Sequence, residues 1–194
     1  MEPQAIEIAK GVLEEAALVH RRFAARGLEP LVAAAAAIRN ATDAGRRVFA
    51  FGNGGSATDA QHLVAELVGR FETERPALAG IALTADTSVL TAVANDYSYE
   101  HVFSRQIEAL GCRGDVAVGI STSGRSSNVE RALASAKTRG LVTIALTGRD
   151  GGLMGAEADI HVNVAETSTA RIQEVHRTVL HAICKLVDLE RARR

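Results

Sequence analysis

The stretch VFAFGNGGS at residues 48–56 decides the fold of this chain. Its first four residues are apolar, which is typical of a strand that is buried on both faces of a sheet. A glycine-rich turn follows, and the amphipathic pattern over about residues 57–71 then indicates a helix. A strand, a tight turn and a helix in this order predict a parallel sheet built from βαβ units.

The same alternation continues toward the C-terminus. Apolar runs predict four more strands, at residues 80–83, 116–120, 142–146 and 160–164. Amphipathic patterns predict further helices at about residues 86–95, 101–110, 127–139 and 169–192. We therefore expect an α/β fold with a doubly wound, five-stranded parallel sheet.

The first 45 residues have a different pattern. Apolar residues at helical spacing predict helices over residues 4–25 and 30–44, with an interruption at Gly27 and Pro30. We expect these helices to form a hairpin that packs on the sheet. Residues 1–194 would then form a single domain, which is also the default for a chain of this length.

Composition argues against several classes of function. The 22 basic and 23 acidic residues give a net charge of −1, and aromatic residues make up only 4% of the chain. We therefore expect no broad basic surface or stacking platform for nucleic acid, although a local site can still bind a small anion. No apolar run is long enough to span a membrane, no signal-peptide pattern is present, and the two cysteines form no CxxC pair. These features favour a cytoplasmic protein that contacts no membrane.

Two loops at the carboxyl ends of predicted strands suit a phosphate or a sugar. The first is Gly52–Ser56, and the second is Ser121–Ser126, which is rich in hydroxyl groups. Both precede helices, whose first amides and positive dipole end attract anions. Helix capping is the alternative for part of this pattern, because Ser56 with Asp59 and Ser127 with Glu130 fit a capping box.

Two helices carry side chains suited to a metal or to acid–base chemistry. His62 and Glu66 lie one turn apart on one helix face, where they could bind a divalent metal or form a solvated ion pair. Gln173 and His181 lie on the last helix, about 80° apart around its axis, so both could border one site. His176 lies between them in sequence and is either a competing candidate or a structural histidine.

Several short motifs occur along the chain in the same order as in a known protein family. The set comprises GNGGSA at 52–57, DAQH at 59–62, AND at 94–96, STSG at 121–124, LTG at 146–148 with DGG at 150–152, and RIQE at 171–174. The chain resembles the sugar isomerase (SIS) domain proteins and, among them, the phosphoheptose isomerases. This resemblance implies a flavodoxin-like strand order and conversion of sedoheptulose 7-phosphate to D-glycero-D-manno-heptose 7-phosphate through an enediol-type proton transfer.

The resemblance also implies the site residues. Glu66 and His181 match the proposed acid–base pair, and one zinc ion per subunit would be held by His62, Glu66, Gln173 and His181. A histidine bound to metal is not free to act as an acid, so the metal role and the acid–base role are separate hypotheses. The implied contacts to the sugar phosphate are Asn53, Gly54, Gly55, Ser56, Glu66, Asn95, Asp96, Ser121, Thr122, Ser123, Ser126 and Gln173.

Finally, the resemblance implies a homotetramer with active sites where subunits meet. A second class of SIS protein binds a replication initiator and regulates chromosome replication without catalysis, and the stretch at residues 70–76 resembles that class equally well. The presence of both Glu66 and His181 favours the enzyme. One departure lies in the second loop, where Arg125 replaces an asparagine that is common in the isomerases.

Overall fold

A five-stranded, all-parallel sheet forms the centre of the computed structural model, which describes residues 2–192. Its strands are β1 (Val48–Gly52), β2 (Gly80–Ala82), β3 (Val116–Ser121), β4 (Val142–Gly148) and β5 (Ile160–Val164). Their spatial order is β2-β1-β3-β4-β5, which confirms the predicted flavodoxin-like order. The chain reverses its direction of winding between β1 and β3, so ligands are expected at the carboxyl ends of these two strands.

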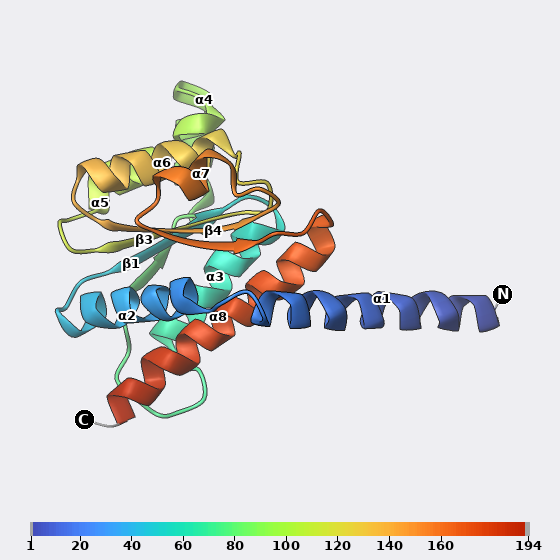
Figure 1. The fold of residues 1–194 in the computed structure, drawn as a ribbon. Helices are drawn as coiled ribbons and strands as arrows, with labels where there is room; N and C mark the ends of the chain where they lie inside the picture. The colour runs from blue at the N-terminus through green and yellow to red at the C-terminus, as the bar shows by residue number, and fades with distance from the viewer. Residues whose placement is uncertain (1, 193–194) are drawn as a thin grey trace.

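Helices cover both faces of the sheet (Figure 1). One face carries α2 (Glu29–Asp43), α3 (Gly55–Val68) and α8 (Thr169–Ala192). The other carries α5 (Ser104–Leu110), α6 (Ser127–Thr138) and α7 (Gly152–Glu157), while α4 (Thr87–Asp96) and the 3₁₀ turn η1 (Tyr99–His101) lie toward its rim. The doubly wound arrangement is therefore confirmed. Sequence patterns missed α7, because two of its six residues are glycines that lower helix propensity.

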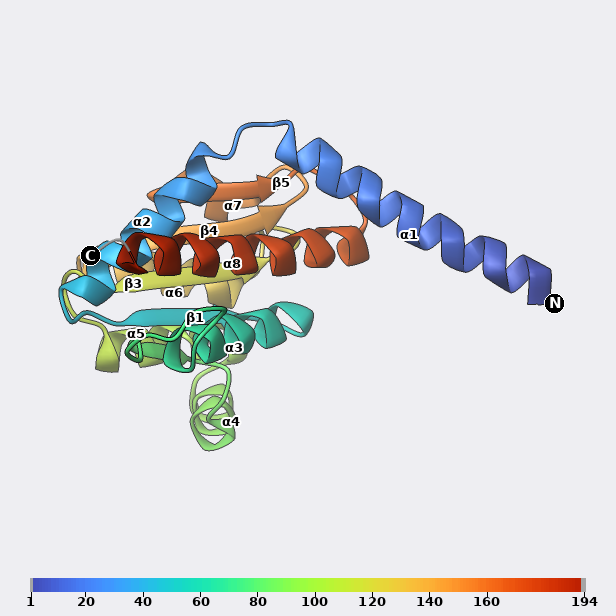
Figure 2. The same ribbon diagram turned by 90° about the horizontal axis from the view of Figure 1, so that it is seen from below.

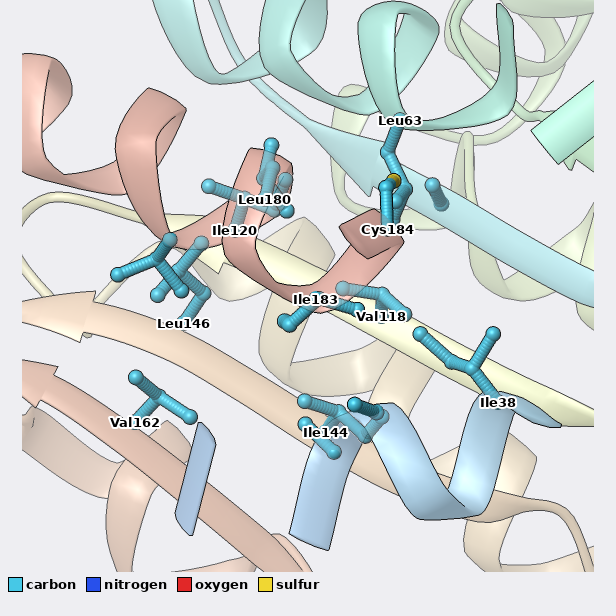
Figure 3. Close-up of a cluster of buried hydrophobic side chains, with 14 of the residues drawn as sticks. Ile38, Leu63, Val118, Ile120, Ile144, Leu146, Val162, Leu180, Ile183 and Cys184 are labelled. Atoms are coloured by element: carbon cyan, nitrogen blue, oxygen red, sulfur yellow. The ribbon is translucent and has the colours of Figure 1, made fainter. Parts of the chain in front are cut away.

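The core has two parts, one on each side of the sheet. Strand β1 contributes side chains to both parts of the core, because alternate side chains of a strand point to opposite faces. Val48 and Ala50 join an aliphatic cluster with residues of α2, α3 and α8, part of which is shown in Figure 3. Phe49 and Phe51 join the other cluster, where the ring of Phe51 lies 5.5 Å from that of Phe103. The fully buried phenylalanines Phe49, Phe51 and Phe103 thus lie on one side of the sheet, whereas the partly buried Phe23 and Phe71 pack against the other cluster.

The two N-terminal helices differ in how they pack. Helix α2 buries Leu31, Ala34 and Ile38 against the sheet face, as expected. Helix α1 (Glu2–Ala24) buries only Val19 and extends away from the sheet (Figures 1 and 2). Both N-terminal helices nevertheless pack on the sheet domain, α2 against the sheet and the C-terminal half of α1 against α8, where His20 Nε2 lies 2.9 Å from Thr178 Oγ1 and Arg171 donates to the carbonyl of Val12. The N-terminal half of α1 projects beyond the sheet (Figure 2).

The capping-box interpretation of the two loops is wrong. Helix α3 has Gly54 as its N-cap and α6 has Ser126, and neither makes a side-chain capping bond. Ser56 falls inside α3 because Gly54, at φ +56°, is the N-cap and the helix starts two residues earlier than expected. The loop serines are therefore available for other partners.

Among residues 2–192, no helix combines the length with the hydropathy that a membrane span requires.

Candidate active site

The two glycine- and serine-containing loops lie side by side. Gly52 is paired in register with Ile120, so the turns that follow β1 and β3 leave the sheet at the same edge. A Cβ atom on Gly52 would lie 2.7 Å from the carbonyl oxygen of Ile120 and 2.8 Å from the Cβ of Ser56. Glycine is therefore required at this position by close approach of the backbone.

Hydroxyl groups converge inside the second loop. The Oγ of Ser121 lies 2.9 Å from that of Ser126 and 3.2 Å from that of Ser123, and the Ser123 Oγ accepts a bond from the amide of Arg125. Ser126 directs its hydroxyl to Ser121 instead of capping α6. This arrangement brings together several donors beside the start of a helix, which suits phosphate oxygens. Thr122 is half-buried in the same loop.

Asn128 and Tyr99, which the sequence patterns did not single out, hold the first loop through Asn53. The side-chain amides of Asn53 and Asn128 exchange two hydrogen bonds, of 2.8 and 2.9 Å, and the hydroxyl of Tyr99 donates to Asn53 Oδ1 at 3.1 Å. Asn128 is buried at the start of α6. Its position two residues after Ser126 was a signal that it faces the same loops, although nothing in the sequence indicated its pairing with Asn53.

Three side chains from α3 and α8 converge as a candidate metal centre. One ligand atom each of His62, Glu66 and His181 lies within 4.8 Å of the others. The two imidazole Nε2 atoms are 2.7 Å apart, and His62 Nε2 is 3.3 Å from Glu66 Oε1. His62 and Glu66 therefore form the close pair that their spacing predicted, at 28% and 20% exposure, and His181 joins them from the other helix. Two imidazoles and a carboxylate are a donor set that suits zinc and similar divalent metals.

The surroundings of this cluster favour the neutral form of His62. Burial, reinforced by the positive charge of Arg177, lowers the pKa of His62 below its ordinary value. A neutral imidazole is the form that binds a metal. The ring of Phe71 lies 5.4 Å from the ring of His181 and covers one side of the cluster.

Two ion pairs join the helices that carry the cluster. On one side, Arg177 of α8 lies 2.7 Å from the buried carboxylate of Asp59 on α3. On the other side, the buried Arg75 pairs with Asp188 of α8 at 2.6 Å. Arg75 also donates to the backbone carbonyl of Glu66 at 2.6 Å, at the C-terminal end of α3. These contacts fix how α3 and α8 lie against each other on both sides of the cluster.

Gln173 and His176 have different surroundings on α8. Gln173 lies against the first loop, because a Cβ atom on Gly55 would be 2.4 Å from its Nε2 atom. His176 is fully buried and its Nε2 lies 2.9 Å from the carbonyl oxygen of Thr147. Burial lowers the pKa of His176 to about 4. His176 is thus a structural histidine, while Gln173 and His181 face α3.

Asn95 and Asp96 are the predicted site residues that lie apart from the rest. They end α4, which has no buried residue, and Asn95 donates to Asp96 at 2.8 Å. Within the described residues, neither side chain makes a hydrogen bond to either loop. The structure of one chain therefore brings together the loops and the α3–α8 cluster, and does not connect this pair to them.

Arg125 lies on the outer side of the second loop. Its guanidinium pairs with Asp150, and both side chains are more than 60% exposed. This hydrogen bond lowers the pKa of Asp150. Gly124 brings the loop against the turn after β4, since a Cβ atom there would lie 2.1 Å from the Gly151 carbonyl oxygen. The ion pair thus bridges two neighbouring loops at the surface.

The family that matches this chain and the relatives that resemble it agree with each other. The SIS domain family matches residues 13–148, which include both loops, His62 and Glu66. The chain is 52% identical over 180 residues to a probable phosphoheptose isomerase of Thermoplasma acidophilum, covering 93% of this chain and 97% of that protein. It is also 52% identical over 164 residues to a phosphoheptose isomerase of Neisseria meningitidis serogroup C, with 83% of each chain covered.

Solved structures agree with these relatives. Phosphoheptose isomerase GmhA from Neisseria gonorrhoeae superposes with a TM-score of 0.90 at 44% identity, covering 95% of this chain and 98% of that one. A phosphoheptose isomerase from Francisella tularensis gives a TM-score of 0.89 at 34% identity, with the same coverage.

Proposed function

The chain belongs to the SIS domain family and, within it, to the phosphoheptose isomerases, and we propose that it converts sedoheptulose 7-phosphate to D-glycero-D-manno-heptose 7-phosphate. The observation that carries the proposal is the convergence of Glu66 and His181, from two helices, beside loops suited to a sugar phosphate. An aldose–ketose isomerase needs a base and an acid near one end of its substrate and an anion site for the other end.

The proton transfers can be assigned to this pair. The carboxylate of Glu66 removes a proton from C1 of the ketose, while His181 supplies a proton to the oxygen on C2, which gives an enediol. Return of a proton to C2 and loss of the proton from the oxygen on C1 complete the aldose. No atoms are gained or lost, so the reaction needs no co-substrate.

We assign the substrate contacts by position. The hydroxyl-rich loop of Ser121, Thr122, Ser123 and Ser126 would hold the phosphate. Asn53, Gly54, Gly55, Ser56 and Gln173 line the adjacent edge of the sheet and would contact the sugar, together with Asn95, Asp96 and Glu66. The hydrogen bonds among the serines and the contact of Gln173 with Gly55 support this assignment.

We propose one zinc ion per subunit, held by His62, Glu66, Gln173 and His181. The donor atoms of the two histidines and the glutamate fit such an ion in chemistry and spacing. When bound, the ion would stabilise negative charge on the substrate oxygens. Because a metal-bound imidazole cannot also donate a proton, the metal role and the acid role of His181 require separate tests.

We further propose a homotetramer located in the cytoplasm, with its active sites where subunits meet. The apolar residues of the projecting α1 support assembly: Ile6, Ile8 and Leu13 are each at least 60% exposed. Exposed apolar side chains on the part of a helix that projects beyond its own domain are typical of an interface. Light scattering coupled to size-exclusion chromatography tests this, with Leu13→Glu expected to reduce the assembled mass.

The binding of a replication initiator is the weaker alternative. It rested on the stretch at residues 70–76, but Arg75 of this stretch is buried and bonds to Asp188 and to the end of α3. Arg75 therefore has a structural role that requires no binding partner. A purely binding function, by contrast, gives no role to Glu66 and His181.

Incubation of the pure protein with sedoheptulose 7-phosphate, with and without zinc, tests the proposal. We expect heptose 7-phosphate to appear, as measured by anion-exchange chromatography or NMR. If no heptose phosphate forms under either condition, the enzyme proposal fails, and capture of the replication initiator by the immobilised protein then tests the alternative.

A further inference from the structure

The side chain of Asn53 has its hydrogen-bonding capacity almost fully used before any ligand arrives. A carboxamide offers two N–H donors and one oxygen that can accept two bonds. Asn53 Oδ1 accepts from Asn128 Nδ2 and from the hydroxyl of Tyr99, which fills the oxygen. Asn53 Nδ2 donates to Asn128 Oδ1, which leaves one N–H of this side chain free.

The groups that hold Asn53 come from separate elements. Asn128 is 3% exposed and lies in the first turn of α6, immediately after the serine loop. Tyr99 belongs to η1, is 57% exposed, and reaches Asn53 only through its hydroxyl. The reciprocal pair of amide bonds fixes the plane of the Asn53 carboxamide. The bond from the Tyr99 hydroxyl comes from a different element and, in this structure, identifies the oxygen end of the Asn53 side chain.

We propose that Asn128 and Tyr99 are positioning residues that fix Asn53 as a hydrogen-bond donor to an oxygen atom of the sugar phosphate. The inference rests on the proposed function for the identity of the ligand, but the orientation of Asn53 is a property of the free protein. The proposal also specifies the contacting atom, because Asn53 would bind the ligand through Nδ2 and not through Oδ1. The same network couples the two loops, because Asn128 starts the helix that follows the serines.

A double-mutant cycle on Asn53→Ala and Asn128→Ala tests this coupling. We expect Asn128→Ala to lower kcat/KM roughly tenfold in the wild-type background, and less than about twofold in the Asn53→Ala background, because its effect passes through Asn53. Asn128→Asp keeps the shape of the side chain but cannot donate to Oδ1, so it should reproduce most of the loss. The exposed Asn40→Ala is the matched control and should leave kcat/KM unchanged. Equal losses in both backgrounds would overturn the proposal.

Tyr99→Phe removes one hydroxyl from an exposed ring and does not endanger the fold. We expect a two- to threefold lower kcat/KM, with an unchanged melting temperature. The same loss after Asn53→Ala would show that Tyr99 acts by another route.

The orientation itself can be measured without substrate. In ¹⁵N-resolved NMR spectra, the Asn53 carboxamide, identified by its absence in Asn53→Ala, should show one proton protected from exchange and one unprotected. Asn128→Ala should abolish the protection. A wild-type protein that shows this protection but no turnover would reject the proposed reaction and keep the positioning network. An Asn53 signal that does not change in Asn128→Ala would reject the network itself.

Discussion

The two ends of α3 differ in physical chemistry, although the proposed function gives them one substrate. At its N-terminal end, the first loop and the neighbouring serine loop present hydroxyls, amides and glycines that are held by neutral hydrogen bonds. Beyond its first turns, His62 and Glu66 meet His181, and ion pairs of buried side chains fix the two helices. We call these the binding half and the reactive half. Under the proposed function, the binding half would recognise an anion with little formal charge, which is compatible with a chain of net charge −1.

The difference between the two halves indicates how precisely the side chains of each half must be positioned. A proton transfer requires an acid and a base at defined positions, and in this chain two helices far apart in sequence provide them. Phosphate binding tolerates more variation, because several donors share one ligand. Variants of the reactive half should therefore lower kcat, and variants of the binding half should mainly raise KM.

Glu66→Gln is expected to have the largest effect. It keeps the shape of the side chain but removes the base, so kcat should fall roughly a thousandfold. The measurement is the steady-state rate of heptose 7-phosphate formation, with circular dichroism to confirm an intact fold. Glu72→Gln, in an exposed ion pair with Lys185, is the control and should retain activity. Substantial activity of Glu66→Gln would refute the role of Glu66 as the base.

Asp188→Asn should destabilise the reactive half next most strongly. It leaves the buried guanidinium of Arg75 without its charged partner, which costs about 3 kcal/mol of unfolding free energy. Zinc affinity should also fall, because Arg75 fixes the end of α3. Urea denaturation and zinc titration measure the two effects. Lys185→Gln breaks an exposed ion pair on the same helix and should cost under about 1 kcal/mol, so equal losses would contradict this account.

The buried His176 should make the stability of the folded protein depend on pH. Its pKa is lowered to about 4 in the folded protein, so the unfolded chain takes up its proton first as the pH falls. Stability should be fully present above about pH 7 and decrease by about 3 kcal/mol near pH 4. His176→Gln, which can still donate to the Thr147 carbonyl, should flatten this dependence in denaturation measured at several pH values. An unchanged pH dependence would show that other groups cause the acid sensitivity.

Ser121→Ala should affect binding more than chemistry. Its hydroxyl links Ser123 and Ser126, so its removal disorders the donors of the loop and should raise KM roughly tenfold, with kcat within about threefold of wild type. Ser127→Ala is the matched control, because Ser127 is exposed and no hydrogen bond of its side chain contributes to the loop. A loss confined to kcat would break the division between the two halves.

Arg125→Asn is expected to have the smallest effect. The side chain is 62% exposed and pairs with Asp150, so its replacement by the residue common in the family should change KM less than about threefold. A larger change, measured in the same assay at low and high salt, would show that Arg125 takes part in phosphate binding.

Sequence patterns predicted the sheet, because buried parallel strands leave continuous apolar runs such as residues 116–120. The positions of His62 and Glu66 followed from helical spacing, whereas the contribution of His181 came from the family resemblance. What could not be predicted depends on tertiary contacts. The pairing of Asn53 with Asn128 joins residues 75 apart in sequence, and the role of Arg75 depends on a partner on the last helix. The projection of the N-terminal half of α1 was also missed, because its helical pattern does not say what it packs against.

Calorimetric titration of Glu66→Gln with sedoheptulose 7-phosphate tests the division between the two halves most directly. We predict that this variant binds the sugar phosphate with a Kd within roughly tenfold of the wild-type KM while forming product roughly a thousandfold more slowly, and that adding Ser121→Ala weakens this binding. Loss of binding together with turnover in Glu66→Gln would contradict the account, because recognition would then depend on the reactive half.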